Sequence, residues 1–179
     1  MTLTEKSEFN QYWYSPETID TIVSELVEYG KETRIAFLST PTVWISACKF
    51  ALIGDLFEFD ASFARHANDE CQFIQYDFNN PSDVPPNHKY DIAVIDPPFI
   101  TEKVLKAYFI TCDEILNSCG KIIISTIAEN ADILNKVSGQ SFTPVKFQPS
   151  IPNLVYQYSL FVNYKISEQS PFNKINANI

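Results

Sequence analysis

The stretch Asp91-Ile-Ala-Val-Ile-Asp-Pro-Pro-Phe99 is the most informative part of the chain. Four apolar residues stand between two aspartates, which is typical of a buried strand in a parallel sheet. Pro97 and Pro98 have no backbone N–H to donate, so the strand is expected to end at Asp96. In an open α/β sheet, ligands bind beyond the carboxyl ends of the strands, and Asp96 is expected at that edge.

Outward from this strand, strand and helix patterns alternate along the chain. Strands are expected at 34–39, 55–60, 72–78, 91–96 and 121–127, and helices at 16–29, 43–52, 61–68, 101–118 and 129–138. This alternation predicts a parallel sheet with helices on both faces. Two last strands, at 141–148 and 154–165, have no helix between them and should be antiparallel. The predicted α/β fold, a Rossmann-like seven-stranded sheet, resembles the layout of S-adenosylmethionine-dependent methyltransferases.

One domain is expected over residues 1–166, since 179 residues with 45% hydrophobic content suffice for a single core. Ser15 suits the N-cap of the helix at 16–29, Pro16 its first position and Gly30 its end. Residues 167–179 are polar and are expected to form a frayed tail.

The charge of the chain bears on its partners. Twenty-two acidic residues against 13 basic ones give a net charge of −9. This charge opposes a phosphate backbone and favours a basic protein, so no nucleic-acid partner is expected. The four glycines include no Gly-x-Gly, which removes the usual dinucleotide and P-loop fingerprints.

Cysteine and histidine spacing indicates no metal site. The four cysteines are Cys48, Cys71, Cys112 and Cys119. None are spaced as Cys-x-x-Cys, and His66 and His88 lie far apart in the sequence, so four buried, reduced thiols of a cytoplasmic protein are expected. The N-terminus does not resemble a signal peptide, and no apolar run is long enough to span a membrane.

Asp96, Pro97, Pro98 and Phe99 together resemble the Asn/Asp-Pro-Pro-Tyr/Phe motif of methyltransferases that act on amine or amide nitrogens. The carboxylate and a proline carbonyl can accept hydrogen bonds from the target amine and so aim its lone pair. The Phe99 ring can pack on a planar base or on the stem and charge of a lysine. A strand that merely ends in a Pro-Pro turn is the alternative.

Acidic residues close two other predicted strands. A carboxylate after the second strand can hold both ribose hydroxyls of a cofactor, and Asp60 is the first candidate, with Glu58 as a competitor on the same face. Asp77, after the third strand, can accept from an adenine amino group. Each could instead be an exposed turn acid or a helix cap.

The first strand ends in Ser39-Thr40-Pro41-Thr42, where methyltransferases usually have a glycine-rich turn. Ser39, Thr40 and Pro41 are therefore candidate cofactor contacts, or the site is degenerate. In the stretch Gln11-Tyr-Trp-Tyr-Ser-Pro-Glu-Thr18, Tyr14-Ser15-Pro16 resembles the Tyr-Thr-Pro segment that precedes the first strand in many amino-methyltransferases. This resemblance implies that Tyr14 and Ser15 lie against the cofactor, and Trp13 is a candidate contact of the substrate. Core aromatics before a capped helix are the alternative explanation of this stretch.

These segments, with Phe57-Glu-Phe-Asp60, Tyr76-Asp-Phe-Asn-Asn-Pro81 and the late segments Asn153-Leu154 and Val162-Asn163-Tyr164, resemble the eukaryotic elongation factor 1-alpha lysine methyltransferases. This class I family was first labelled adenine-specific DNA methyltransferase, and its Ser-Thr-Pro-Thr turn is typical. The resemblance implies methyl transfer from S-adenosylmethionine to a lysine of elongation factor 1-alpha in the cytoplasm.

Two other functions remain open from the sequence: methylation of an adenine amine in nucleic acid, and a catalytically silent binding subunit. In the favoured mechanism, Asp96 orients the amine rather than acting as a strong base, because a free carboxyl with a pKa of about 3.9 matches an ammonium poorly. Phe99, with Trp13 or Tyr14, is expected to form the wall of the lysine channel. No metal is needed.

Overall fold

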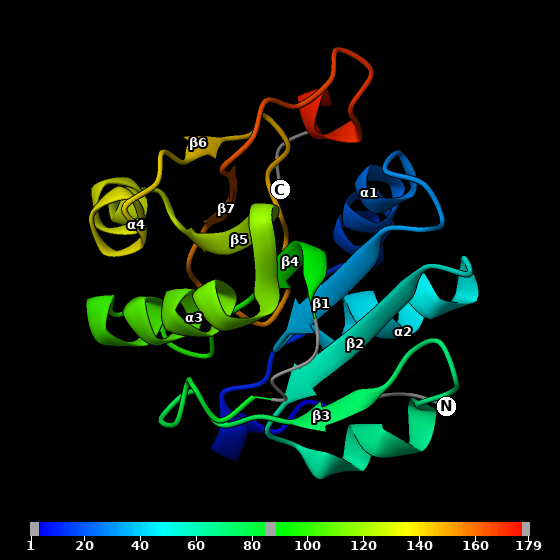
Figure 1. Cartoon of the computed structure of the whole chain (residues 1–179). Helices are drawn as coiled ribbons and strands as arrows, with labels where there is room; N and C mark the ends of the chain where they lie inside the picture. Colours follow the sequence, from blue (N-terminus) through cyan, green and yellow to red (C-terminus); the bar gives the residue numbers. More distant parts are fainter. Residues whose placement is uncertain (1–3, 85–88, 177–179) are drawn as a thin grey trace.

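The computed structural model describes residues 4–84 and 89–176. His88 and the last three residues of the expected tail lie outside these ranges. Seven strands form one sheet in the order β3-β2-β1-β4-β5-β7-β6 (Figure 1). The strands are β1 (Arg34–Leu38), β2 (Ile53–Glu58), β3 (Phe73–Gln75), β4 (Tyr90–Ile95), β5 (Leu116–Ile127), β6 (Thr143–Pro144) and β7 (Tyr158–Val162).

The strand directions confirm the predicted fold class. β1 lies at the centre of the parallel part of the sheet and pairs with β2 and β4. β3 and β5 extend this parallel part on either side. β7 pairs antiparallel with both β5 and β6. The carboxyl ends of β1 to β5 therefore meet at one edge of the sheet.

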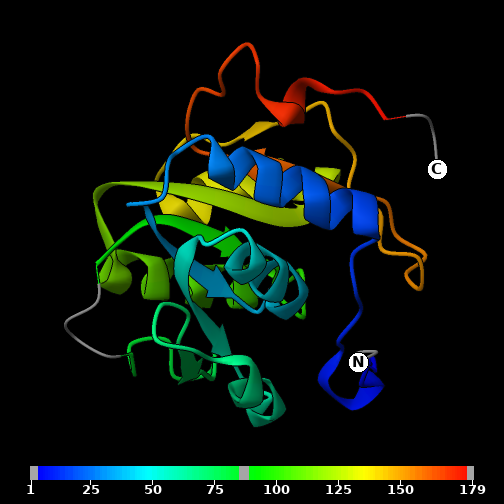
Figure 2. The same ribbon diagram turned by 90° about the vertical axis from the view of Figure 1, so that its right-hand side faces the viewer.

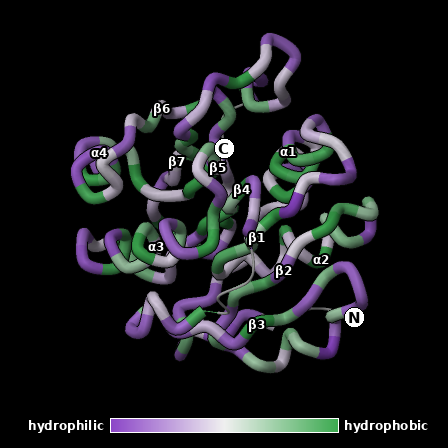
Figure 3. The backbone as a smooth tube through the Cα atoms, in the orientation of Figure 1, coloured by the Kyte–Doolittle hydropathy of each residue, from purple (hydrophilic) through white to green (hydrophobic). Residues whose placement is uncertain are grey.

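Helices cover both faces of the sheet. α1 (Pro16–Val27) and α2 (Pro41–Lys49) pack on one face, and α3 (Glu102–Ile115) and α4 (Ala131–Ser138) pack on the other. Figure 2 shows α1 and α2 in front of the sheet. In Figure 3 the hydrophilic residues concentrate in the outer loops. Successive residues of β1, such as Phe37 and Leu38, point to opposite faces of the sheet and enter different core clusters, as the pleat of a strand requires.

Several elements differ from their predicted bounds, and β3 covers only Phe73–Gln75 of the strand expected at 72–78. The expected helix at 61–68 is a 3-10 helix, Ala61–His66, and α3 ends at Ile115 because β5 begins at once. The strand expected at 141–148 has only Thr143 and Pro144, because the amides of Lys146 and Phe147 donate to the Phe172 carbonyl instead of continuing the sheet. The last strand, expected at 154–165, is limited to 158–162.

The expected frayed tail is wrong for residues 167–176. Phe172, in a 3-10 helix (Pro171–Asn173), is fully buried and belongs to the same core cluster as α1. Ser170 Oγ donates to the buried carboxylate of Glu25 in α1 at 2.5 Å. One buried aromatic ring is enough to order a polar segment, and composition does not reveal it.

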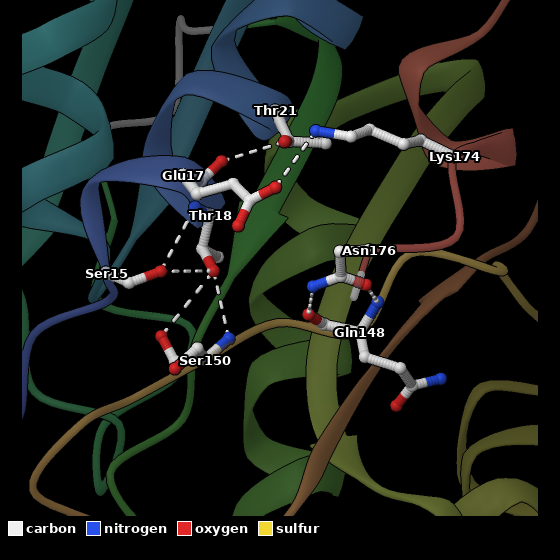
Figure 4. A network of polar contacts seen from close by, with 8 residues as sticks. All are labelled: Ser15, Glu17, Thr18, Thr21, Gln148, Ser150, Lys174 and Asn176. Carbon is white, nitrogen blue, oxygen red and sulfur yellow. Dashed lines mark hydrogen bonds and ion pairs between the residues drawn. The ribbon is translucent and has the colours of Figure 1, made fainter. Parts of the chain in front are cut away.

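Further contacts tie this C-terminal segment to the start of α1 (Figure 4). Lys174 Nζ pairs with Glu17 at 2.9 Å, and Asn176 exchanges two hydrogen bonds with the backbone of Gln148. Ser15 caps α1 by accepting from the Thr18 amide, and its own amide donates to the Ser150 carbonyl at 2.8 Å. The N-cap predicted from the sequence is confirmed.

The cysteines differ from the expectation of four reduced, buried thiols. Cys48 at the end of α2 and Cys71 before β3 form a disulfide, because these segments bring their Cα atoms to 6.4 Å. Cys112 is a buried free thiol, whereas Cys119 is free but exposed. No helix within the described ranges is long and apolar enough to cross a membrane.

Candidate functional site

A pocket with a cavity of about 250 Å³ opens at the carboxyl edge of the parallel strands. Its walls come from the residues that follow β1, β2, β3 and β4, together with the chain before α1 and the loop between β6 and β7. This is the position at which open α/β sheets bind ligands. Clusters of His, Cys, Asp or Glu suited to a metal ion do not occur in the described part of the chain.

The turn after β1 explains how a chain without glycines there can form the pocket. Ser39 has a φ of 56°, the left-handed conformation that favours glycine, and its hydroxyl lies 2.6 Å from that of Tyr108. Thr40 then stands at the N-cap position of α2, with its hydroxyl donating to the Val94 carbonyl, and Pro41 is the first residue of the helix. Ser39 and Pro41 line the pocket.

Glu58 and Asp60 occupy different surroundings. Glu58 ends β2, lines the pocket and accepts a hydrogen bond from the Asp60 amide at 3.1 Å. Burial raises the pKa of the Glu58 carboxyl. The Asp60 carboxylate is bound by Lys6 Nζ at 2.7 Å and by the Ser62 amide at 3.0 Å. Burial raises the pKa of Asp60, but these hydrogen bonds outweigh it and lower the pKa overall.

Residues 5–13, which we call the N-terminal strap, form part of the pocket wall. Polar contacts hold the strap at both ends: Lys6 pairs with Asp60, and Glu5 accepts hydrogen bonds from the Trp13 amide and from Asn153 Nδ2. Between them, the side-chain amide of Asn10 donates to the carbonyl of Pro98. Glu8 to Trp13 all line the pocket.

Two buried polar atoms of the strap have no hydrogen-bond partner among the described residues. They are Gln11 Oε1, an acceptor, and Trp13 Nε1, a donor. Both residues line the pocket, and Gln11 is only 8% exposed. Buried polar atoms are rarely left unpaired, because an unmade hydrogen bond costs ~1–3 kcal/mol. A bound ligand is the natural partner for both atoms.

Asp96 lies at the floor of the pocket, directly after β4. Burial raises the pKa of its carboxyl to about 7, and the nearby charge of Glu58 adds to the rise. The nearby hydroxyls of Tyr14 and Ser125 oppose this rise in pKa. Burial beside Asp96 in turn raises the pKa of the Tyr14 hydroxyl. The expectation that Asp96 has the pKa of a free carboxyl is therefore wrong.

The pocket unites most of the candidate residues. Eight of them line it: Trp13, Ser39, Pro41, Asp77, Asp96, Pro97, Pro98 and Phe99. Four others do not: Ser15 caps α1, Thr40 precedes α2, Tyr14 is buried in the core, and Asp60 is paired with Lys6. The carboxylate of Asp77 also accepts hydrogen bonds from Asn79 and Asn80 of its own loop.

Sequence reasoning missed several lining residues. Tyr76, Phe78 and Tyr108 form a packed aromatic group behind the pocket, with Phe78 and Tyr108 stacked at 6.2 Å. Ile151 and Leu154 come from the loop before β7, and Tyr158 is the first residue of that strand. The period of a helix or strand predicts burial, but it does not show which buried residues border a cavity.

Comparison with known proteins agrees with this geometry. A family model described as probable N6-adenine methyltransferase matches residues 5–166. EEF1A lysine methyltransferase 1 of Bos taurus is 33% identical over 175 residues, with 89% of this chain and 71% of that protein covered. The protein of the same name in Danio rerio is 31% identical, with 87% of this chain and 96% of that one covered.

The fold is similar to that of solved methyltransferases. A structure described as a predicted O-methyltransferase from Agrobacterium tumefaciens gives a TM-score of 0.60 at 14% identity, covering 83% of this chain and 81% of that one. At this identity the likeness concerns the fold alone. The family match and the relatives confirm the resemblance read from the sequence. This chain therefore belongs to the methyltransferase family described as probable N6-adenine methyltransferase and to that of the relatives named EEF1A lysine methyltransferase 1.

Proposed function

We propose that this enzyme transfers a methyl group from S-adenosylmethionine to a lysine ε-amine of elongation factor 1-alpha. The carrying observation is the charge of the pocket. Four acidic residues line it, namely Glu8, Glu58, Asp77 and Asp96, and no lysine or arginine lines it within residues 4–84 and 89–176. Lys6 is close, but its ammonium is paired with Asp60. Such a pocket attracts an ammonium and repels a phosphate.

The residues present fit the cofactor. Glu58 is our choice for the ribose hydroxyls, because its carboxylate lines the pocket while that of Asp60 is paired with Lys6. Asp77 remains the proposed acceptor for the adenine amino group, and Ser39 and Pro41 lie at the start of α2 beside the cavity. The free atoms Gln11 Oε1 and Trp13 Nε1 offer one more acceptor and one more donor. When bound, the cofactor supplies a methyl group on a cationic sulfur.

Asp96 acts on the target nitrogen. Its carboxylate accepts a hydrogen bond from the ε-amine and aims the lone pair, which is the role expected from the motif. Because the pKa of Asp96 is about 7, its carboxylate is also a better proton acceptor than a free aspartate, although lysine with a pKa of ~10.4 still holds its proton more tightly.

Aromatic side chains enclose the lysine. Phe99 and Trp13 line the pocket on either side of its mouth, and Tyr158 lines it close to the charge of Asp96. These rings can contact the lysine stem and its charge, and they limit the entry of water. We therefore propose that Asp96, Pro97, Pro98 and Phe99 form the catalytic motif, with Trp13 and Phe99 on the substrate.

Methylation of an adenine amine is the second candidate, favoured by the description of the family model and by the Asp-Pro-Pro-Phe motif. The acidic pocket opposes it, because nucleic-acid binding depends on cations that neutralise phosphates. The resemblance to the elongation factor 1-alpha lysine methyltransferases also implies a cytoplasmic location, which is part of the proposal.

Methyl-labelled S-adenosylmethionine tests the function. The purified enzyme is incubated with elongation factor 1-alpha and, separately, with RNA and with duplex DNA. We expect label in the protein alone, and a loss of at least ~100-fold with Asp96→Asn, whose cofactor affinity by calorimetry should stay near that of wild type. Label in nucleic acid alone would favour the adenine reaction. Undetectable cofactor binding at millimolar concentration would favour the silent subunit.

A further inference from the structure

Exposed apolar side chains gather around the mouth of the pocket. In the described ranges, eight large hydrophobic side chains are exposed, and Phe9, Phe59 and Phe99 among them line the pocket. Val155 and Tyr156 stand between two further lining residues, Leu154 and Tyr158. We call these five exposed residues the apolar rim. Large apolar side chains concentrated at one place of a protein surface indicate an interaction site.

The phenylalanines of the rim are held in fixed positions. The rings of Phe9 and Phe59 meet edge to face at 5.7 Å, and Lys6 Nζ lies 5.5 Å from the centre of the Phe9 ring. Phe99 packs against Phe78 at 6.3 Å, and Phe78 stacks on the buried Tyr108. The core therefore supports these rings while leaving part of each in water.

The loop that carries Val155 and Tyr156 is also fixed, next to the strap. Asn153 Nδ2 donates to Glu5 Oε2 at 2.7 Å, and Gln157 Nε2 donates to the Pro149 carbonyl at 3.1 Å. Between these two anchors Val155 is 99% exposed and Tyr156 is 66% exposed. Figure 2 shows this loop, in orange, on the same side of the sheet as the blue strap. An exposed valine and tyrosine gain stability only when a partner covers them.

Charge indicates which partner covers the rim. The pocket inside the rim is lined by four acidic residues, so it accepts a cation, and the rim around it accepts apolar surface. A nucleic-acid duplex would place phosphates next to the rim, and phosphates make no favourable contact with the apolar side chains of Val155 and Tyr156. A lysine that projects from an apolar region of a folded protein satisfies both parts.

We propose that the apolar rim docks the folded protein substrate around its target lysine, so that the enzyme recognises the surface surrounding the lysine. This inference rests on the proposed function and adds its basis of specificity. Tight interfaces bury apolar anchors at their centre, next to the group that is recognised. The rim then supplies affinity for the folded substrate, whereas a short peptide fills the pocket and covers little of the rim.

The double variant Val155→Ser/Tyr156→Ser tests the proposal, because both side chains are exposed and lie outside the catalytic and cofactor residues. Phe50→Ser is the matched control: Phe50 is 58% exposed at the end of α2 and does not line the pocket. Steady-state kinetics are measured with folded elongation factor 1-alpha and with a short lysine peptide from it. We expect the double variant to raise KM for the folded factor by ~10-fold or more, with KM for the peptide and cofactor affinity unchanged.

Four outcomes would overturn the inference. Unchanged KM for the folded factor would show that the loop does not dock it, and an equal loss on the peptide would place the effect inside the pocket. A concentration-dependent dimer of wild type in sedimentation, dissociated by the double variant, would assign the rim to a second copy of this chain. If wild type methylates neither folded factor nor peptide, the proposed function itself fails, and the docking proposal fails with it.

Discussion

The side-chain amide of Asn10 donates a hydrogen bond to the carbonyl oxygen of Pro98, across 88 positions of sequence. This contact joins the strap directly to the proposed catalytic motif. The Pro98 carbonyl therefore accepts one hydrogen bond from the strap, and its second lone pair and the Asp96 carboxylate can still accept from the target amine. A movement of the strap would thus reach the motif through Asn10.

Lys6→Met should loosen the strap. The variant removes the ion pair with Asp60, in which Lys6 is 35% exposed, and such a pair contributes ~1 kcal/mol at most. We expect amide hydrogen exchange at residues 8–13 to become several-fold faster and cofactor affinity to fall by less than ~10-fold. Lys174→Met, which removes the exposed pair with Glu17, is the control and should change neither. Equal exchange rates in both variants would show that Lys6 does not hold the strap.

Two matched variants test whether Glu58 or Asp60 binds the ribose of the cofactor. Glu58→Gln removes the carboxylate that lines the pocket, and a charge-assisted hydrogen bond of ~1.5–3 kcal/mol corresponds to a ~10- to 100-fold loss of S-adenosylmethionine affinity. Asp60→Asn should weaken binding much less, because that carboxylate is bound by Lys6 and the Ser62 amide. Calorimetry measures both. A larger loss of affinity in Asp60→Asn than in Glu58→Gln would show that Asp60 binds the ribose.

Asp96 should make stability depend on pH. Its pKa is raised from 3.8 to about 7, so the folded state binds more protons than the unfolded state between these values, and stability falls as pH rises through that window. The side chain at position 96 of the variant Asp96→Asn does not titrate. The free energy of unfolding of the variant, relative to that of wild type, should therefore be higher at pH 8 than at pH 4 by ~1–2 kcal/mol. Urea unfolding of both proteins at each pH measures the difference. A constant difference across the window would contradict a raised pKa.

Ser39 offers a test of backbone strain. Ser39→Gly and Ser39→Ala both lose the hydrogen bond to Tyr108, but only glycine relieves the left-handed φ of 56°. The strain is worth ~1–2 kcal/mol, and the freedom of glycine in the unfolded chain offsets part of it, so the glycine variant should be more stable by ~0.5–1 kcal/mol. Thermal unfolding compares the two. An alanine variant as stable as the glycine variant would mean that the turn relaxes.

The C-terminal segment should be necessary for stability. Phe172→Ala removes a fully buried ring and is expected to cost ~3–5 kcal/mol. Ile175→Ala, at a position that is 78% exposed, should stay within ~0.5 kcal/mol of wild type. Chemical denaturation gives both values. A similarly small loss of stability in both variants would show that the C-terminal segment is frayed, as its composition suggests.

The sequence predicted what local patterns control. Alternating apolar strands and amphipathic helices gave the order of elements, and Ser15 and Pro16 marked the start of α1 correctly. The motif from Asp96 to Phe99 also lies where the strand pattern placed it, at the pocket. These signals depend on neighbours in sequence, which is why one chain is enough to read them.

Features that depend on distant residues could not be read. Lys6 binds Asp60 across 54 positions and so separates two acids, Glu58 and Asp60, that look equivalent in sequence. The pairing of Cys48 with Cys71 likewise depends on how α2 meets β3. The pKa of Asp96 follows from burial and from Glu58, and neither is visible in the motif itself. Each of these features comes from tertiary contacts, which no local pattern specifies.

The packing of the C-terminal segment on α1 also concerns how the protein is made. Phe172 and Ser170 complete the cover of a helix that leaves the ribosome some 145 residues earlier, as the Ser170–Glu25 separation shows. β7, which inserts between β5 and β6, is likewise a late product of synthesis. Since chains are built at ~5–20 residues per second, the first helix waits for seconds beside an unfinished core. Folding of this core is therefore completed only after Ser170 and Phe172 have left the ribosome.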